Sequence, residues 1–346
     1  MSESPPAPEA PADEASAAAD GQEHRWPVET GGERLDVEVS RRLDTPRNRV
    51  QRWIREGRVS LSDGVARRAS RRVERGQWVA ITVEPERSSE LEPDPEPIDV
   101  LWEDEHLLFL DKPPGLVVHP APGHSTGTLS HRLIAHAPGL ANVGHPQRPG
   151  IVHRLDAGTS GVMVVAKTTS AYDALSRAFA ERRVDKRYLA FCHGRFKDEP
   201  IEVDLAIGRH PKDRKRMAPR PDGRPAQTTF TPLREANGVT AVAVQLHTGR
   251  THQIRVHLKA LRRPLIGDAI YGEDRWRETE GPARRVVRTF ERPALHAWRL
   301  RLNHPLDGTP LEATASLPED LRSLWSALSD EALPGAPPDP STVDRS

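Results

Sequence analysis

The sequence contains very little cysteine: Cys192 is the only one among 346 residues. A single thiol cannot form a disulfide within its own chain, and it cannot build a metal cluster from several thiolates. We therefore expect a reducing compartment. The sequence also lacks an apolar run of the roughly 18 residues that cross a membrane, and its N-terminus lacks the basic and apolar regions of a signal peptide. These absences predict a cytoplasmic protein that does not enter a membrane.

Signals for metal binding and nucleotide hydrolysis are also missing. No pair of the candidate histidines shows four-residue helical spacing with an acidic partner, and no cysteine lies nearby. The glycine-rich GxxxxGK motif that holds nucleotide phosphates is absent as well. We therefore expect no metal and no cofactor, and we interpret the histidines as structural or as contacts to the substrate. The histidines considered are His119, His131, His136, His145, His153 and His252.

Positive and negative side chains are unevenly distributed along the chain, although Lys+Arg and Asp+Glu both number 50. Several stretches contain almost no charge of one sign. Residues 1–24 carry six acids and no Lys or Arg, and residues 84–105 carry ten acids and one Arg. By contrast, residues 25–83 hold 14 Arg against eight acids, and residues 209–224 hold seven Lys or Arg against two acids. This segregation indicates polyanion-binding surfaces beside acidic segments. On charge alone, basic surfaces that only keep the protein soluble fit equally well.

Composition divides the chain into two folded regions with connecting and terminal segments. A chain of this length exceeds what one core usually organises. Residues 1–24 are rich in Ala, Pro and acids, which predicts a disordered acidic tail. Residues 85–99 are acidic and Pro-rich, which predicts an extended linker. The folded regions are then expected at residues 25–84 and 100–328, with a C-terminal tail at 329–346.

The first region shows the pattern of two short helices followed by strands. One apolar stripe at helical spacing covers residues 35–43, and a second covers residues 50–54 and ends at Gly57. Residues 59–61 and 78–83 have the composition of strands. These elements predict a module of roughly fifty residues, within the usual size range of small domains.

Segments of this module carry a resemblance to a known RNA-binding domain. The strings RLD, IREGRVSLSDG and RGQWVAITV are similar to those of the small domain of the ribosomal-protein S4 type. The resemblance implies an α/β RNA-binding module whose helices present basic side chains. A small helix-strand domain with a merely solvated Arg face is the alternative. The expected RNA-contacting side chains are Arg41, Arg42, Arg49, Arg52 and Arg55.

The second region alternates apolar strand candidates with helical stretches, which predicts an α+β domain. The strand candidates are residues 107–110, 162–166, 188–192 and 240–246, and residues 170–183 form a helical pattern. Residues 250–261 predict a further helix, with Ile254, Leu258 and Leu261 on an apolar side and His252, Arg255 and Lys259 on another. Arg255 can therefore be presented to a site.

One loop carries the strongest signal for chemistry. The segment GIVHRLDAGTSG, residues 150–161, places Asp156 before two glycines and is followed by the apolar strand VMVVAKT. Glycines allow a backbone and a ligand to approach closely, and the strand holds the loop rigid. Arg154 supplies a cation on the same loop. An ordinary turn in which Asp156 caps its own loop is the alternative.

The string HRLD followed by TSG resembles the active-site motif of the Rlu family of RNA pseudouridine synthases. Further blocks match the family in the family's order: DKPPGLVVHP, KRYLAFCHG, RPAQTTF, HTGRTHQIRVHLKAL, PLIGDAIYG and ALHAWRLRLNHP. Together they span the second region and resemble the RluA/RluD type, closest to RluD-type enzymes of large-subunit ribosomal RNA. The resemblance implies a catalytic domain built on a mixed, mainly antiparallel sheet with flanking helices.

The resemblance also implies roles for single residues. Asp156 aligns with the essential catalytic aspartate, Tyr188 with the active-site tyrosine, and Arg255 with the basic residue that pairs with the aspartate. Arg154 aligns with the arginine that holds the base out of the helix. A guanidinium partner makes chemical sense because it offsets the desolvation of a buried carboxylate. Further expected substrate contacts are His153, Thr159, Arg250 and His252, and the basic loop adds Arg214, Lys215 and Arg216 as RNA contacts.

The implied reaction is an isomerisation of uridine that needs no cofactor. The N-glycosidic bond breaks, the uracil turns, and a C-glycosidic bond forms. The base must be flipped out or unpaired to reach a buried carboxylate, and water must be excluded. Attack of Asp156 on the ribose C1′, attack on the ring C6, and assistance to elimination at C2′ all stay open.

Three competing interpretations remain at the level of sequence. A ribosome-assembly factor could bind RNA without chemistry, although the residues for chemistry are present. A carbohydrate-active hydrolase would need two opposed carboxylates, and the loop supplies only Asp156. A transfer-RNA substrate is the third. We expect a monomer whose partner is ribosomal RNA or the assembling large ribosomal subunit.

Overall fold

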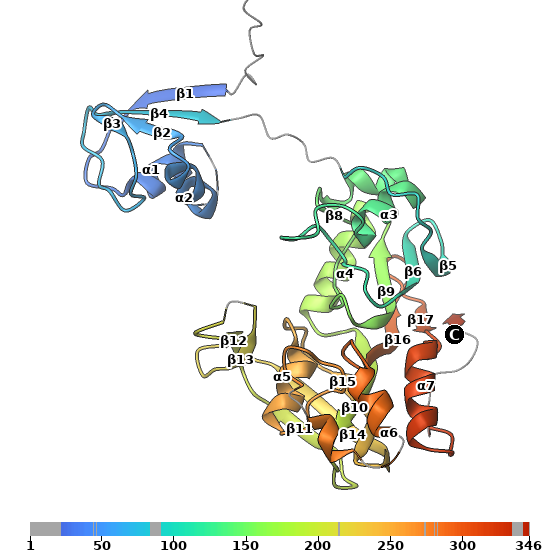
Figure 1. The fold of residues 1–346 in the computed structure, drawn as a ribbon. Coiled ribbons are helices and arrows are strands. Elements are labelled where there is room, and N and C mark those ends of the chain that lie inside the picture. Colours follow the sequence, from blue (N-terminus) through green and yellow to red (C-terminus); the bar gives the residue numbers. More distant parts are fainter. Residues whose placement is uncertain are drawn as a thin grey trace, which may run out of the picture. The chain divides into compact units, whose positions relative to one another are not determined.

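The computed structural model separates the chain into two compact units, residues 1–89 and 90–346 (Figure 1). The structure describes residues 22–43, 45, 47–83, 91–213, 215–272, 275–279, 281, 283–333 and 342–345. Most of the expected acidic tail, residues 85–90 of the expected linker, and Arg214 lie outside the described residues, as does the side chain of Arg49.

The first unit is a four-stranded antiparallel sheet packed on two helices. The strand order is β1 (Gln22–Pro27), β4 (Trp78–Val83), β2 (Val59–Leu61) and β3 (Gly64–Val65), and the helices are α1 (Leu35–Arg42) and α2 (Arg47–Arg55). Both helices and the strands at 59–61 and 78–83 were predicted. Strand β1 was not predicted. Residues 22–24, which we assigned to the acidic tail, pair with residues 81–83 of β4, so that part of the tail prediction is wrong.

A buried carboxylate joins the two helices of the first unit. Asp36 is fully buried and accepts hydrogen bonds from Arg34 Nε (2.9 Å), Arg47 Nη2 (3.0 Å) and Gln51 Nε2 (2.7 Å). The hydrogen bond from Arg34 is the main cause that holds the pKa of Asp36 far below its usual value. The aspartate of the RLD string therefore has a structural role in this unit.

The second unit is built on a ten-stranded sheet. Its strand order is β11-β14-β15-β10-β16-β9-β6-β5, with β17 added beside β16 and β18 beside β17. Strands β9 and β16 pair in parallel, whereas all other neighbours in this sheet are antiparallel. The expected mixed, mainly antiparallel sheet with flanking helices is confirmed. The strands are β5 (Asp99–Glu103), β6 (Leu107–Lys112), β9 (Ser160–Ala166), β10 (Asp185–His193), β11 (Ile201–Asp204), β14 (Gln227–Ala236), β15 (Val239–Leu246), β16 (Leu295–Asn303), β17 (Pro310–Thr314) and β18 (Thr342–Arg345).

Helices and short hairpins complete the second unit. The α-helices are α3 (Leu129–His136), α4 (Thr169–Ala180), α5 (Gln253–Ala260), α6 (Ala283–Thr289) and α7 (Glu319–Leu328), and the 3-10 helices are η1 (Pro138–Asn142) and η2 (Arg275–Glu278). Two small hairpins are formed by β7 (Gly144–His145) with β8 (Arg148–Pro149), and by β12 (Ile207–Arg209) with β13 (Met217–Pro219). The predicted helices at 170–183 and 250–261 are both present in slightly shorter form.

The central strands contain long apolar stretches because both faces of the sheet are covered. Every residue of β9 is buried. Leu108 and Leu110 of β6 pack in one cluster with α3 and α5, whereas Leu107 and Phe109 pack with α4 on the other face. Side chains that alternate between two covered faces explain why the four strand candidates were visible as continuous apolar runs. Tyr188 lies on the face of α3 and α5.

Two terminal segments belong to the second unit although we assigned them to a linker and a tail. Leu91 is buried in the core cluster that also contains Leu108 and Leu129. Strand β18 pairs with β17 from Thr342 to Arg345. The expected linker at 85–99 therefore ends earlier than predicted, and part of the expected tail at 329–346 extends the sheet.

Candidate active site

One pocket of about 720 Å³ collects the eight residues that the sequence assigned to catalysis and substrate binding. They come from the loop before β9, from β10, and from the start of α5. The eight lining residues that were predicted are His153, Arg154, Asp156, Thr159, Tyr188, Arg250, His252 and Arg255. Motif blocks that lie far apart in the sequence thus meet around a single pocket.

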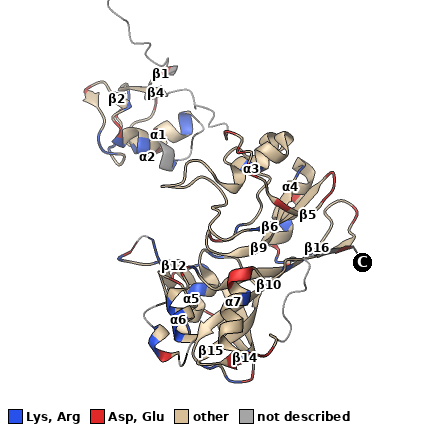
Figure 2. Ribbon diagram, turned by 45° about the vertical axis from the view of Figure 1, so that its right-hand side comes forward, with Lys and Arg blue, Asp and Glu red and all other residues tan. Residues whose placement is uncertain are grey.

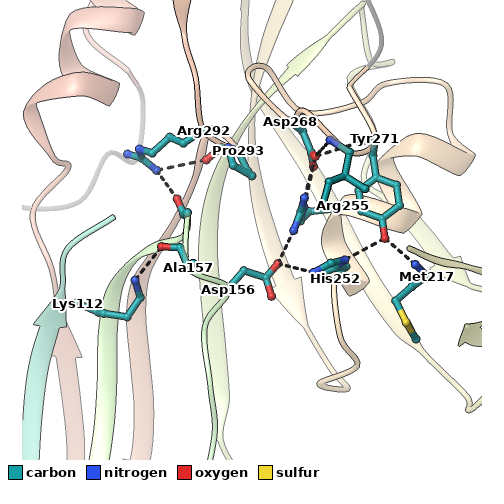
Figure 3. A network of polar contacts seen from close by, with 12 residues as sticks. Lys112, Asp156, Ala157, Met217, His252, Arg255, Asp268, Tyr271, Arg292 and Pro293 are labelled. Atoms are coloured by element: carbon teal, nitrogen blue, oxygen red, sulfur yellow. Dashed lines mark hydrogen bonds and ion pairs between the residues drawn. The ribbon is translucent and has the colours of Figure 1, made fainter. Parts of the chain in front are cut away.

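A buried lysine holds the backbone of the Asp156 loop from one side (Figure 3). Lys112, at the end of β6, donates to the carbonyl of Ala157 (3.1 Å) and to those of Pro113 (2.7 Å) and Leu116 (3.0 Å). Burial lowers the pKa of Lys112 to about 7, and the charge of Arg292 acts in the same direction. Three carbonyl acceptors favour the ammonium form, and they fix the orientation of the peptide that follows Asp156.

An arginine holds the same loop from the other side. Arg292 Nη1 donates to the carbonyl of Gly158 at 3.1 Å and lies 3.3 Å from the carbonyls of Pro293 and Leu295 (Figure 3). Its Nη2 donates to Asp320 in the first turn of α7 at 2.8 Å. The two carbonyls after Asp156 are therefore each bound by a cationic side chain, which leaves the loop little freedom to turn.

Gly158, together with the serine and the glycine of the TSG string, allows the backbone of this loop to pack closely. Gly161 has φ +116°, and a Cβ there would lie 2.2 Å from the carbonyl oxygen of Ala297 in β16. A Cβ at Gly158 would lie 2.9 Å from Pro293. Ser160 hydrogen-bonds to His296 Nδ1 at 3.0 Å. These contacts explain why the loop needs small residues: they let β16 approach closely.

The guanidinium of Arg255 connects two aspartates. Its Nη1 donates to Asp156 Oδ2 at 3.0 Å, while Nε and Nη2 donate to the two oxygens of Asp268 at 2.7 and 2.8 Å (Figure 3). The Asp268 side chain is completely buried, and its Oδ1 also accepts from the backbone N–H groups of Ile270 and Tyr271. Asp268 therefore fixes the guanidinium in a plane that points Nη1 at Asp156.

The charge state of Arg255 follows from the same contacts. Burial works to lower the pKa of Arg255, but the hydrogen bonds to Asp268 and the charges of Asp268 and Asp156 raise it above its usual value. The side chain of Arg255 is 7% exposed and that of Asp156 is 20% exposed. A permanently charged, nearly dry guanidinium thus faces the carboxylate of Asp156, which opens into the pocket.

A histidine and a tyrosine form the next part of the network. His252 adopts a left-handed backbone conformation with φ +55°, and its Nδ1 lies 2.9 Å from Tyr271 Oη. The same oxygen accepts a hydrogen bond from the backbone N–H of Met217 at 2.8 Å. Nε2 lies 3.9 Å from Asp156 Oδ2, which is too long for a hydrogen bond. Burial is the main cause that lowers the pKa of His252.

Tyr188 lies in the apolar wall of the pocket. It belongs to the same cluster as Leu246, Ile254 and Leu295, which also line the pocket. The pairing of β10 with β16 shifts register between Arg187 and Leu189, and such irregularities redirect side chains near sites. Burial, followed by the charge of Asp156, raises the pKa of Tyr188, so the phenol stays neutral.

His153 is held in the wall of the pocket by its own contacts. Its ring stacks on Phe179 at 4.7 Å, and its Nε2 accepts the backbone N–H of Val164 at 3.0 Å. Burial lowers the pKa of His153 to about 3, and the charge of Lys186 adds to the shift. A neutral ring whose Nε2 is already bonded shapes the pocket and does not carry protons.

The predicted RNA-contacting arginines of the first unit are largely paired with acids. Arg41 pairs with Glu33 and Glu38, Arg42 lies 3.8 Å from Glu29, and Arg52 lies 3.8 Å from Glu56, while Arg55 donates to a backbone carbonyl. Figure 2 shows further basic residues on the β12–β13 hairpin of the second unit. There Arg216 lies 5.4 Å from the centre of the Tyr271 ring.

The pocket does not offer the two opposed carboxylates of a glycoside hydrolase. Of the described residues that line it, only Asp156 carries a carboxylate, because Asp268 is buried behind Arg255. Within the described part of the chain, no group of three His, Cys, Asp or Glu residues is arranged to hold a metal. None of the helices in the described ranges has the length and apolar character needed to cross a membrane.

Four residues of this site were not assigned by the sequence. Asp268 and Tyr271 lie in the block PLIGDAIYG, Lys112 lies in DKPPGLVVHP, and Arg292 lies just before ALHA. The available signal was a charged or polar side chain beside apolar residues in each block. Such residues are buried only when something pairs with them, so each was a candidate for an internal contact.

Comparisons with known proteins identify relatives of this chain. Residues 106–260 match the family model described as RNA pseudouridylate synthase. The chain is 40% identical over 314 residues to the ribosomal large subunit pseudouridine synthase D of Xanthomonas campestris, covering 90% of this chain and 93% of that protein. It is 39% identical to the protein of that name in Escherichia coli, covering 86% of this chain and 91% of that protein.

A relative of unassigned role and a solved structure lead to the same family. The chain is 39% identical to an uncharacterized RNA pseudouridine synthase of Bacillus subtilis, over 87% of this chain and 95% of the relative. The solved structure of human RNA pseudouridylate synthase domain containing 1 is 30% identical, covers 70% of this chain and 93% of its own, and superimposes with a TM-score of 0.54. The chain belongs to the family of RNA pseudouridine synthases.

Proposed function

We propose that the protein converts uridines of large-subunit ribosomal RNA to pseudouridine, with Asp156 as the catalytic carboxylate. The observation that supports this most is the pocket in which Asp156, the one carboxylate among the described lining residues, is held by the buried Arg255. The choice of ribosomal RNA is supported by the relatives of Xanthomonas campestris and Escherichia coli, which are named for the large ribosomal subunit. An enzyme with this substrate works in the cytoplasm, and we propose that it acts as a monomer.

The reaction rearranges a nucleotide without changing its composition. The bond between N1 and C1′ breaks, a bond between C5 and C1′ forms, the proton on C5 leaves, and N1 gains a proton. Asp156 serves as the ionised carboxylate next to the reacting atoms, and Arg255 offsets the cost of keeping it charged in a nearly dry place. Tyr188 and the apolar side chains beside it provide the surface against which a flipped-out uracil packs.

The pocket has the size and charge for a nucleotide of RNA. Its volume of about 720 Å³ lies within the range of small-ligand sites, roughly 300–1,000 Å³. Besides Arg255, its described lining includes Arg148, Arg154, Arg182, Lys186, Arg224 and Arg250. Such an excess of positive charge attracts the RNA backbone. We propose that the S4-like first unit and Lys215 and Arg216 of the β12–β13 hairpin add further backbone contacts.

Mapping of pseudouridine in cells tests this function. Large-subunit ribosomal RNA and transfer RNA are isolated from cells with and without the gene, and each pseudouridine is located by mass spectrometry after chemical labelling. We expect one or more positions in large-subunit RNA to lose the modification and to regain it when the gene is restored. Losses confined to transfer RNA would replace the proposed substrate. No loss in either RNA would contradict the proposed activity and favour a non-catalytic assembly factor.

The loop contact of Arg292 gives a further prediction. Replacing Arg292 with methionine removes the N–H groups that hold the carbonyl of Gly158, so Asp156 is oriented less well. One lost hydrogen bond of this kind costs about 1–1.5 kcal/mol, so we expect kcat to fall about tenfold. KM should change little because Arg292 does not line the pocket.

The control for this prediction keeps the arginine and changes its partner. Asp320→Asn weakens the ion pair with Arg292 but leaves the donor to Gly158 in place, so its effect on kcat should be smaller. Both variants are assayed by steady-state pseudouridine formation on one RNA, at a temperature where each is folded. A wild-type kcat in Arg292→Met would show that the loop does not depend on this residue.

A further inference from the structure

A second hollow adjoins the proposed active site. It has a volume of about 420 Å³ and shares Arg182, Leu246 and His247 with the larger pocket. Its other walls include Gln227 of β14 and Gln245 of β15. Since the two hollows have lining residues in common, a chain molecule that occupies one can continue into the other. Nothing in the isomerisation itself requires this second space.

Arg182 lines both hollows, and no described residue compensates its charge. It is exposed, and its guanidinium has neither an ion pair nor a hydrogen bond with any residue that the structure describes, whereas Arg183 pairs with Glu181 and Arg187 with Asp185. Its charge also reaches Arg250, where burial is the main cause of a lowered pKa and the charges of Arg224 and Arg182 add to it. Neighbouring cations without a carboxylate are stabilised by a bound anion.

The backbone of Arg182 is in a conformation that favours glycine. Its φ is +62°, and it directly follows the last residues of α4. The N–H of Arg182 bonds to the carbonyl of Phe179 (3.3 Å) and that of Arg183 to the carbonyl of Ala178 (2.9 Å), which is the Schellman pattern at the end of a helix. Glycine is the usual residue at this point because it has no Cβ. Here the chain carries an arginine that lines both hollows.

The floor of the second hollow offers two amide side chains. Gln245 pairs across the sheet with Thr229, and Gln227 lies two residues before Thr229, so the two amides lie on the same face of neighbouring strands. Gln245 Nε2 lies 3.5 Å from Asp185 Oδ1, and the Gln227 amide has no hydrogen bond with the residues described. Amides present a donor and an acceptor side by side, which suits the edge of a nucleobase.

We propose that the second hollow is the subsite for the nucleotide next to the target uridine. The phosphate that joins the two nucleotides lies on Arg182, and the neighbouring base enters the hollow against Gln227 and Gln245. The inference rests on the proposed function for its substrate class, RNA. It goes beyond that function because it assigns a flanking nucleotide to particular residues and makes them a source of sequence preference.

The first test uses the backbone of Arg182 to separate stability from binding. Arg182→Gly should raise the melting temperature, because glycine suits the positive φ, and yet weaken RNA binding about tenfold with a salt slope reduced by about one. Arg262→Gly is the matched control. Arg262 has φ +58°, occupies the same position after α5, and lines neither hollow. Its variant should gain the same stability and keep the RNA affinity of the wild type.

The second test changes the RNA. The probe is a stem-loop that spans the uridine found by cell mapping, with either a methylphosphonate at a flanking phosphate or an abasic site at a flanking position. On one side of the target, the methylphosphonate should weaken binding to the wild type. It should cause no further loss of affinity in the Arg182→Gly variant. The abasic site on that side should weaken binding to the wild type. It should cause no further loss of affinity in the Gln245→Leu variant. Such non-additivity identifies groups in direct contact.

The outcomes distinguish this inference from the proposed function. One outcome is that the wild type converts the target while the losses of affinity caused by the protein variants and by the RNA modifications add up on both sides of the target uridine. In that case the proposed subsite is wrong and the proposed function stands. Equal affinities of Arg182→Gly and Arg262→Gly would overturn the subsite as well. If cell mapping finds no target in any RNA, the proposed function and the subsite both fail.

Discussion

Replacing Asp156 with asparagine is expected to reduce pseudouridine formation by at least about a thousandfold, the scale seen when a catalytic group is removed. The amide has nearly the same shape as the carboxylate, but it is neutral and a far weaker nucleophile or base. It also cannot supply the negative charge that Arg255 faces at 3.0 Å. Each of the three routes that the sequence leaves open for Asp156 requires this charge, so the expected loss does not depend on which one operates.

The fold should survive this substitution because the loop is held by its backbone. Lys112 and Arg292 bind the carbonyls of Ala157 and Gly158, and neither contact involves the Asp156 side chain. Arg255 keeps its bidentate pair with Asp268. We therefore expect a free energy of unfolding within about 1 kcal/mol of the wild type, as for substitutions that create no cavity and no buried unpaired charge.

The measurement is single-turnover pseudouridine formation with enzyme in excess, alongside RNA binding and thermal unfolding. Asp173→Asn is a matched control, since Asp173 is an exposed carboxylate of α4 that lies outside the pocket. This control should react like the wild type. A rate for Asp156→Asn within about tenfold of the wild type, less than 1.4 kcal/mol of barrier, would remove Asp156 from its role.

The sequence revealed those strands of the fold that contain a continuous run of apolar residues. The strands β6, β9, β10 and β15 were visible because continuous apolar runs are needed when both faces of a sheet are covered. Strand β1 was hidden because its polar residues 22–24 continue the composition of the acidic tail, and β18 was hidden in the same way at the other end. Pairing partners far along the chain, not local composition, make these two segments into strands.

The site was predictable where chemistry requires a side chain at a fixed place in a motif, and not where a side chain binds backbone. Lys112 and Arg292 act on carbonyl oxygens, which are present at every residue, so the sequence could mark these side chains as candidates for an internal contact but could not identify their partners. Helix α5 presents Arg255 to the pocket, as its pattern of polar and apolar residues allowed. The sequence did not show that this side chain is buried there, because Asp268 satisfies the guanidinium from a loop thirteen residues later.

Replacing Arg255 with methionine is expected to affect both stability and activity. Methionine keeps the apolar packing of α5 but leaves Asp268 buried without a counter-charge, and breaking a buried pair in this way costs about 3–5 kcal/mol. Asp156 loses its only guanidinium partner within hydrogen-bond distance among the described residues. We expect the rate of pseudouridine formation to fall about a thousandfold, measured by single turnover under conditions where the variant is folded.

A double variant separates the two effects. Adding Asp268→Asn to Arg255→Met removes the uncompensated charge, and the asparagine oxygen can still accept from the N–H groups of Ile270 and Tyr271. The free energy of unfolding, measured with urea, should recover by about 2 kcal/mol or more, because a buried neutral amide with partners costs far less than a buried ion. Activity should not recover, since nothing replaces the cation beside Asp156.

The conservative variant Arg255→Lys completes the argument. A lysine keeps the charge but cannot make three N–H bonds in one plane to two carboxylates, so it should retain more activity than methionine and less than arginine. A double variant that regains the wild-type rate together with its stability would show that Arg255 only supports the fold. A lysine variant as slow as the methionine variant would mean that the geometry of the guanidinium, and not its charge, is what Asp156 requires.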